Sequence, residues 1–126
     1  MIFSAEELKR FSKEIFISIG CPEAEAQQAA DVLVSADLRG VDSHGVARLS
    51  GYIRLHDKNR LNATPNIKTV HETPSTAVVD GDLGLGLVVG PHAMKLAIDK
   101  AKEVGSGWVS VLRILGSSSE PVGFQF

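Results

Sequence analysis

The first sixty residues carry hydrophobic positions at helical spacing, which predicts helices in this part of the chain. A capping-box pattern at Ser4 and Glu7 begins the first helix, and Gly20 ends it. The apolar face of this helix is expected to carry Leu8, Phe11 and Ile15. The second helix begins near Pro22 and extends to Leu38. Its inward positions, several of them small enough for close helix packing, are Ala26, Ala29, Ala30, Leu33 and Val34.

A third helical pattern starts near residue 42 and fades near residues 57–59. Gly40 can close the preceding helix in a left-handed conformation, and Asp42 or Ser43 can accept the first free N–H groups of the next one. Residues four apart lie on one side of a helix. One side of this helix is therefore expected to present His44, Arg48 and Tyr52. A neighbouring side is expected to pack into the domain through Val46, Leu49 and Ile53.

After this helix the pattern changes to short runs that are partly β-branched. Residues 67–72 and 76–79 are predicted strands joined by a turn, and residues 108–112 are a further predicted strand. Residues 85–104 have the pattern of a helix, in which Pro91 should make the first turns irregular or kinked. Its inward positions are expected to be Val88, Val89, Ala93, Leu96, Ala97 and Ala101. One strand–helix–strand unit is too small to close a sheet by itself.

The fold class is therefore α/β (α+β), with a change of composition near residues 62–66 as the domain boundary. We expect a helical subdomain over residues 1–62 and the start of an α/β domain over residues 63–112. Residues 113–126 form a separate, polar and turn-rich tail with exposed-looking Phe124 and Phe126.

Composition narrows the class of protein. Of the 126 residues, 44% are hydrophobic and 22% are charged, as is ordinary for a globular domain. A net charge of −2 offers no electrostatic basis for binding nucleic acid or an anionic membrane. The single cysteine, Cys21, excludes an intrachain disulfide and fits a reducing compartment. With no secretory or membrane-spanning pattern, a cytoplasmic location is expected.

The best functional lead is the pair of His44 and Arg48. A proton-transfer group and a fixed cation one helical turn apart suit a small substrate that carries a carbonyl and a carboxylate. Each residue also has an interpretation without a catalytic function: His44 as a histidine that hydrogen-bonds locally, and Arg48 as part of a surface ion pair. Ser43 is about as suitable for an N-cap as for a substrate contact. Tyr52 is typical of a packed aromatic residue, and Asp42 of a helix cap or an ion-pair partner.

A family resemblance is carried by residues 36–49, whose sequence is ADLRGVDSHGVARL. This segment resembles the signature of the type-2 malate/L-lactate dehydrogenase family, which also contains ureidoglycolate, sulfolactate and diketogulonate dehydrogenases or reductases. Residues 76–81, 84–86 and 93–101 agree with it, and the resemblance extends from about residue 3 to residue 111. It implies an NAD(P)-dependent oxidoreductase that interconverts 2-hydroxy and 2-oxo acids, built on a non-Rossmann nicotinamide-binding fold.

The resemblance also implies roles for individual residues. His44 takes the catalytic position, giving a proton to the substrate carbonyl oxygen during reduction and accepting it in reverse, which suits a group whose pKa is ordinarily near neutrality. Arg48 takes the substrate-binding position, where it can hold a carboxylate in a bidentate contact. Ser43 is a further substrate-binding candidate. The family implies a homodimer, and most of its NAD or NADP site lies beyond residue 126, so no cofactor-binding residue is assigned.

Three glycines invite a second interpretation as a dinucleotide-binding fingerprint. Gly84, Gly86 and Gly90 follow a predicted strand and open a helix, as that motif requires. The spacing is G-x-G-x-x-x-G, however, and no acidic residue ends a following strand at a suitable place. We therefore interpret these glycines as turn and close-packing residues.

No metal site is predicted, because the remaining candidate ligands lack metal-ligand spacing. These residues are Cys21, His56, His71 and His92. Cys21 also has no adjacent base that would mark it as a nucleophile.

The end of the chain departs from the family. After residue 111 the resemblance predicts an Asn-Ser-x-His-Phe-Gly-like segment, which is absent from this sequence. Family members are several hundred residues long, so the chain looks like their first third with a foreign tail, and our hypothesis is a frameshift or premature stop. The alternative function is a non-catalytic truncated remnant or a helical interaction module, with an unpaired sheet edge and uncovered apolar faces.

Overall fold

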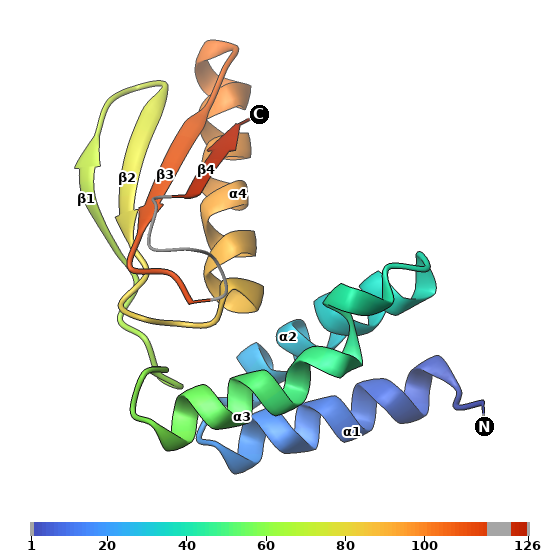
Figure 1. Cartoon of the computed structure of the whole chain (residues 1–126). Helices are drawn as coiled ribbons and strands as arrows, with labels where there is room; N and C mark the ends of the chain where they lie inside the picture. The colour runs from blue at the N-terminus through green and yellow to red at the C-terminus, as the bar shows by residue number, and fades with distance from the viewer. Residues whose placement is uncertain (1, 116–121, 126) are drawn as a thin grey trace. The chain divides into compact units, whose positions relative to one another are not determined.

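The computed structural model describes residues 2–115 and 122–125 of the chain. They form two compact units, which meet in the sequence between Thr64 and Pro65. The first unit is helical and the second contains a β-sheet with one helix (Figure 1). Within the described ranges, no helix combines the length and hydrophobicity needed to cross a bilayer.

The helices of the first unit begin and end close to the predicted positions. They are α1 (Ala5–Ser18), α2 (Glu23–Leu38) and α3 (Leu49–Asp57). The capping box of α1 is confirmed: the Ser4 N–H donates to Glu7 Oε2 at 2.9 Å, and the Glu7 N–H donates to Ser4 Oγ at 3.2 Å. Gly20 follows the end of α1 in a left-handed conformation with a φ of 102°. Pro22 is the N-cap residue of α2.

The core of the first unit lies between α1 and α2, which pack along one another. The predicted inward positions of α2 are confirmed as buried: Ala26, Ala29, Ala30, Leu33 and Val34. The prediction for α1 is wrong at Phe11, which is 53% exposed, whereas Ser12 and Phe16 are buried. Because α2 presents small side chains, the two helices meet closely along a stripe that accepts Ser12, and the larger Phe11 remains at its margin.

The second unit is built on a four-stranded sheet with the order β1-β2-β3-β4. The strands are β1 (Lys68–Glu72), β2 (Thr76–Asp80), β3 (Trp108–Leu112) and β4 (Val122–Gln125). The predicted hairpin is confirmed by antiparallel pairing of β1 with β2. β2 and β3 are parallel, and the chain between them forms α4 (Gly86–Val104), so the predicted strand–helix–strand unit is also confirmed.

One face of this sheet is covered by α4 (Figure 1). Alternate residues of β2 and β3 point toward the helix, as the period of a strand requires. The buried cluster comprises Ala77, Val79, Val109 and Val111 from the strands and Val89, Ala93 and Ala97 from the helix. Lys100 is buried on the same helix at 7% exposure, a position that the hydrophobic pattern did not indicate.

The start of α4 and the tail of the chain both differ from what the sequence predicts. α4 is one uninterrupted helix from Gly86 to Val104 that includes Pro91, and its first turn shows only a bifurcated hydrogen bond common at helix ends, in which the Leu85 carbonyl accepts from Val88 N–H and Val89 N–H at 2.9 Å. The tail is not merely polar and turn-rich, because β4 pairs antiparallel with β3. Backbone hydrogen bonding alone suffices for such pairing, which hydrophobic periodicity cannot reveal. The side chains of Phe124 and Phe126 lie outside the described residues.

Candidate functional site

The candidate site follows directly from the way α2 ends. Gly40 adopts a φ of 75°, and its N–H donates to the Asp37 carbonyl at 2.9 Å. The Val41 N–H then donates to the Ala36 carbonyl, also at 2.9 Å. These two bonds form a Schellman motif, which confirms the predicted left-handed closure at Gly40. The chain turns sharply here and places the next residues beside the end of α2.

The predicted third helix is not continuous. Asp42–His44 and Val46–Arg48 form two separate 3₁₀ turns, η1 and η2, and α3 begins only at Leu49. Gly45 separates the two turns with a φ of −95° and a ψ of −146°, which is an extended conformation. His44, Arg48 and Tyr52 therefore belong to three different elements, and the prediction that they share one side of a single helix is wrong.

The reason for this interruption is the side chain of Asp37. Its Oδ2 accepts a hydrogen bond from the Val46 N–H at 2.9 Å, which replaces the predicted cap from Asp42 or Ser43. A Cβ atom added at Gly45 would overlap the Asp37 carboxylate, so only glycine fits at this position. Sequence reasoning missed Asp37. The available signal was an acidic residue in the last turn of a helix, where the helix dipole disfavours negative charge.

The three predicted site residues are brought together by Ser43. Ser43 Oγ lies 2.8 Å from His44 Nδ1, and the Ser43 carbonyl accepts a hydrogen bond from Arg48 Nε at 2.6 Å. All three residues are exposed. The imidazole and the guanidinium are thus positioned by two different atoms of one residue, and this positioning does not need a shared helix face.

Tyr52 is a packed aromatic residue, as the sequence predicts. Its ring lies 6.1 Å from the Phe16 ring, centroid to centroid, at an interplanar angle of 51°. Burial raises the pKa of the Tyr52 hydroxyl above its ordinary value, and the positive charge of Arg48 partly opposes that shift. Leu49 is buried and Val46 and Ile53 are half-buried, in line with the predicted packing side.

The glycine-rich loop does not fit a dinucleotide within the described residues. The Gly86 N–H, at the start of α4, donates to the Leu115 carbonyl at 2.9 Å. A Cβ at Gly86 would also lie 2.9 Å from that carbonyl oxygen, and one at Gly84 would lie 2.7 Å from Pro65. The chain itself therefore occupies the position where a fingerprint motif receives a pyrophosphate. These glycines are close-packing residues, as the sequence indicated.

The described residues contain no group of three or more histidine, cysteine, aspartate or glutamate side chains that could hold a metal ion. Cys21 is buried, and its pKa is raised to about 11 by that burial and by the charge of Glu25. The thiol is therefore protonated near neutral pH, which does not suit a nucleophile. His56 lies 3.7 Å from the Asp57 carboxylate, a contact that accounts for its position without a ligand.

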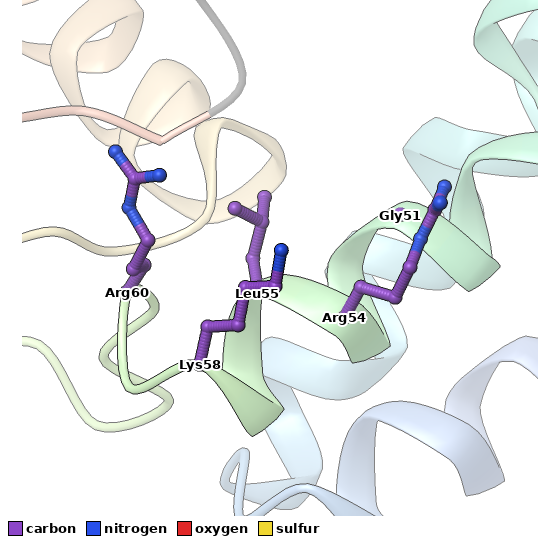
Figure 2. A pocket seen from close by; sticks show the side chains of 5 residues that line it. All are labelled: Gly51, Arg54, Leu55, Lys58 and Arg60. Atoms are coloured by element: carbon purple, nitrogen blue, oxygen red, sulfur yellow. The ribbon is translucent and has the colours of Figure 1, made fainter.

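A shallow hollow of about 290 Å³ lies on the first unit, lined by the residues labelled in Figure 2. They are Gly51, Arg54, Leu55, Lys58 and Arg60. None of Ser43, His44 and Arg48 lines it, so this hollow is separate from the residues that the sequence singled out.

Comparison with known proteins identifies the family of this chain. The family model described as malate/L-lactate dehydrogenase matches residues 3–115, so the match ends slightly beyond the residue 111 expected from the sequence. L-Sulfolactate dehydrogenase of Methanocaldococcus jannaschii is 49% identical over 110 residues, covering 87% of this chain and 32% of that protein. Malate dehydrogenase of Pyrococcus horikoshii is 48% identical over 104 residues, covering 82% of this chain and 29% of that protein.

Solved structures agree with these relatives. The sulfolactate dehydrogenase from Methanocaldococcus jannaschii superimposes with a TM-score of 0.88 at 47% identity, covering 90% of this chain and 33% of that chain. The malate dehydrogenase from Pyrococcus horikoshii gives a TM-score of 0.87 at 44% identity with the same coverage. The chain spans about a third of the length of the curated relatives it matches. On the match over residues 3–115, the chain belongs to the malate/L-lactate dehydrogenase family.

Proposed function

We propose that this chain carries the proton-transfer and carboxylate-binding groups of an oxidoreductase that interconverts 2-hydroxy acids and 2-oxo acids. The observation that carries the proposal is the arrangement around Ser43, which engages His44 through its hydroxyl and Arg48 through its carbonyl. One short segment thereby presents an acid–base group and a fixed cation to solvent, the two functions that a 2-oxo acid requires.

His44 is the catalytic residue of this proposal. Its Nδ1 is engaged by Ser43 Oγ at 2.8 Å, whereas Nε2 has no hydrogen-bond partner in the described part of the chain. When the Ser43 hydroxyl donates to Nδ1, the neutral ring carries its proton on Nε2 and can give it to a carbonyl oxygen. When the ring donates from Nδ1, Nε2 can accept a proton from a hydroxyl group. Ser43 is thus a positioning residue that serves both directions of the reaction.

Arg48 is the substrate-binding residue. Its Nε donates a hydrogen bond to the Ser43 carbonyl at 2.6 Å, while its two terminal nitrogens have no partner among the described residues. These nitrogens remain able to bind a substrate carboxylate, and the bond through Nε restricts the rotation of the side chain. A guanidinium that is oriented beforehand loses less entropy on binding than a free one.

The proposal includes the setting of the reaction. A nicotinamide cofactor, NAD or NADP, supplies or accepts the hydride when it is bound. Because the loop that starts α4 is filled by the Leu115 carbonyl, we place its binding residues outside that loop. We further propose that the protein is a homodimer, which is supported by the open sheet edge at β1. A reducing, cytoplasmic location is supported by the buried, protonated thiol of Cys21.

A second candidate is a non-catalytic remnant or helical interaction module. It is favoured by one specific observation, which is that the glycine-rich loop leaves no space for a pyrophosphate. This candidate predicts that the protein binds no nicotinamide cofactor.

The test is the NADH-dependent reduction of oxaloacetate or pyruvate by the full chain. We expect His44→Ala to lower kcat at least about 100-fold, the scale of general acid–base catalysis. Arg48→Gln should instead raise KM at least about 10-fold, because it removes one charge-assisted contact to the carboxylate. Ser43→Ala removes the hydroxyl beside His44 and should lower kcat and shift its pH profile, but it keeps the carbonyl that accepts from Arg48 and should leave KM nearly unchanged.

Arg39→Gln is the matched control for Arg48→Gln, since Arg39 is an exposed arginine in the same segment. It should leave KM unchanged. Turnover that persists in His44→Ala would reject the catalytic assignment. A fluorescence titration with no saturable NADH binding, together with no turnover, would establish the remnant in place of the enzyme.

A further inference from the structure

The hollow on the first unit concentrates positive charge in one place. Three of its five lining residues are cationic, namely Arg54, Lys58 and Arg60, while Leu55 supplies an apolar wall. Figure 2 shows the side chains of these four residues extending toward the same side in this view. The whole chain has a net charge of −2, so this cluster is a local feature and no general basic character explains it.

The local fold explains why the three cations line one hollow. Arg54 and Lys58 are four residues apart at the end of α3 and so share one side of the helix. Asn59 then adopts a left-handed φ of 55°, which allows the Arg60 N–H to donate to the Leu55 carbonyl at 2.9 Å. The chain is turned back on the helix, and Arg60 is placed beside Leu55.

None of the three cations has a carboxylate partner among the described residues. The nearest acidic residue in the sequence, Asp57, lies 3.7 Å from His56 Nδ1 instead. Elsewhere in the chain exposed lysines do form ion pairs, as Lys95 does with Asp99 at 2.7 Å. Three like charges that share a hollow without a counter-charge repel one another, and a bound anion would remove that repulsion.

The space is open because residue 51 is glycine. A Cβ atom at Gly51 would meet nothing within 4 Å, so its missing side chain leaves part of the hollow empty. The volume of about 290 Å³ is near the lower end of the range for ligand clefts, roughly 300 Å³. The hollow therefore suits a small, multiply charged group and is too small for a whole dinucleotide.

We propose that this hollow, lined by Gly51, Arg54, Leu55, Lys58 and Arg60, binds a small phosphate-bearing anion of about the size of a diphosphate. Two guanidinium groups favour phosphate, because their planar forks match pairs of phosphate oxygens, and the lysine adds a mobile positive charge. The site is distinct from Ser43, His44 and Arg48 and does not depend on the proposed oxidoreductase function.

The experiment is isothermal titration calorimetry of the full chain with inorganic pyrophosphate. Saturable binding is expected, with an affinity that falls as salt is added. The variant with Arg54→Gln, Lys58→Gln and Arg60→Gln should bind at least about 10-fold more weakly, since it removes all three charge-assisted contacts. Gly51→Leu fills the hollow without changing charge and should weaken binding to a similar extent.

The matched control removes three exposed cations elsewhere, by Arg10→Gln, Lys68→Gln and Lys102→Gln. An equal loss of affinity in this control would overturn the proposal in favour of general electrostatic attraction. Binding that is unchanged in Gly51→Leu would overturn the location. Circular dichroism of each variant distinguishes lost binding from lost folding.

Further titrations identify the chemistry and its source. Succinate, a dicarboxylate, should bind at least about 10-fold more weakly than pyrophosphate, and equal binding would overturn the phosphate assignment. ADP that binds more tightly than pyrophosphate would indicate a nucleotide as the source, and equal affinity would indicate free phosphate groups; either supports the site. His44→Ala should retain pyrophosphate binding, which separates this inference from the proposed reaction.

Discussion

Asp37 and Val46 are joined by a hydrogen bond of 2.9 Å from the Val46 N–H to the Asp37 carboxylate, across the segment that contains His44. This bond connects the end of α2 to the second 3₁₀ turn and holds the extended peptide at Gly45 between them. The positions of Ser43, His44 and Arg48 therefore depend on Asp37, whose side chain hydrogen-bonds to Val46 and to none of these three residues.

Removing the Asp37 carboxylate should destabilise the first unit. Asp37→Ala leaves a half-buried N–H without a partner, and we expect the free energy of unfolding to fall by about 1 to 2 kcal/mol. Asp37→Asn keeps an acceptor oxygen and should cost less. Urea denaturation measures both changes. Asp42→Ala, at an exposed position nearby, is the control and should be nearly neutral. An Asp37→Ala protein as stable as the wild type would contradict this role.

Two glycines in the same region should respond oppositely to alanine. Gly45→Ala would force its new methyl group into the Asp37 carboxylate, and a loss of about 1 to 3 kcal/mol is expected from this overpacking. Gly51→Ala lies in helical α3 with open space around its Cβ, so it should gain about 0.5 to 1 kcal/mol. Thermal unfolding of the two variants provides the comparison, and similar shifts in Tm for both would reject it.

Tyr52 is the single tyrosine of the chain, so its ionisation can be followed by near-ultraviolet absorbance. We expect an apparent pKa above the ordinary value of about 10, because burial disfavours the phenolate. Arg48→Gln should raise this pKa further, since it removes a positive charge that favours the phenolate. A lower pKa in that variant would show that Arg48 does not lie near the hydroxyl in solution.

The same titration has a consequence for stability. The folded state holds the Tyr52 proton more tightly than the unfolded state, so this contribution is fully present below a pH of about 10. It is lost as the pH rises through the folded-state pKa. Urea denaturation at several alkaline pH values should show a decline that is weaker in Tyr52→Phe, which cannot ionise.

Lys100 should contribute far more to stability than an exposed lysine on the same helix. Its Nζ donates to Glu72 Oε1 and to the Thr73 carbonyl, both at 2.7 Å, and so ties α4 to the end of β1. We expect Lys100→Ala to cost about 1 to 3 kcal/mol, partly through lost packing of its buried stem. Lys95→Ala removes an exposed pair with Asp99 and should cost less than about 0.5 kcal/mol. Equal costs in urea denaturation would contradict this difference.

The helices and strands were largely predictable because their signals are local. The capping box at Ser4, the helix-ending glycines at positions 20 and 40, and the β-branched runs of β2 and β3 depend on residues near one another in the sequence. The failures have a different origin. Phe11 is exposed and Ser12 is buried because the neighbouring helix α2, whose inward side chains are small, decides which stripe of α1 is buried.

The candidate site shows the same division. Its residues were identifiable from their chemistry and their segment, but their arrangement was not. A helical repeat over residues 44–52 is compatible with the sequence, yet the Asp37 carboxylate competes for the Val46 N–H and divides the segment into two turns. Lys100 escaped notice for a similar reason, since its partners Glu72 and Thr73 lie on a distant strand end.

By itself, then, the sequence determined the α/β class, the positions of most helices and the candidates for proton transfer and carboxylate binding, because periodicity and side-chain chemistry are carried by neighbouring residues. Only the tertiary structure decided that Ser43 joins His44 to Arg48, that the start of α4 is filled by the Leu115 carbonyl, and that three cations line one hollow at the end of α3. Each of these depends on how the backbone turns at Gly45, Gly86 or Asn59, and a turn of this kind is selected by the groups packed around it.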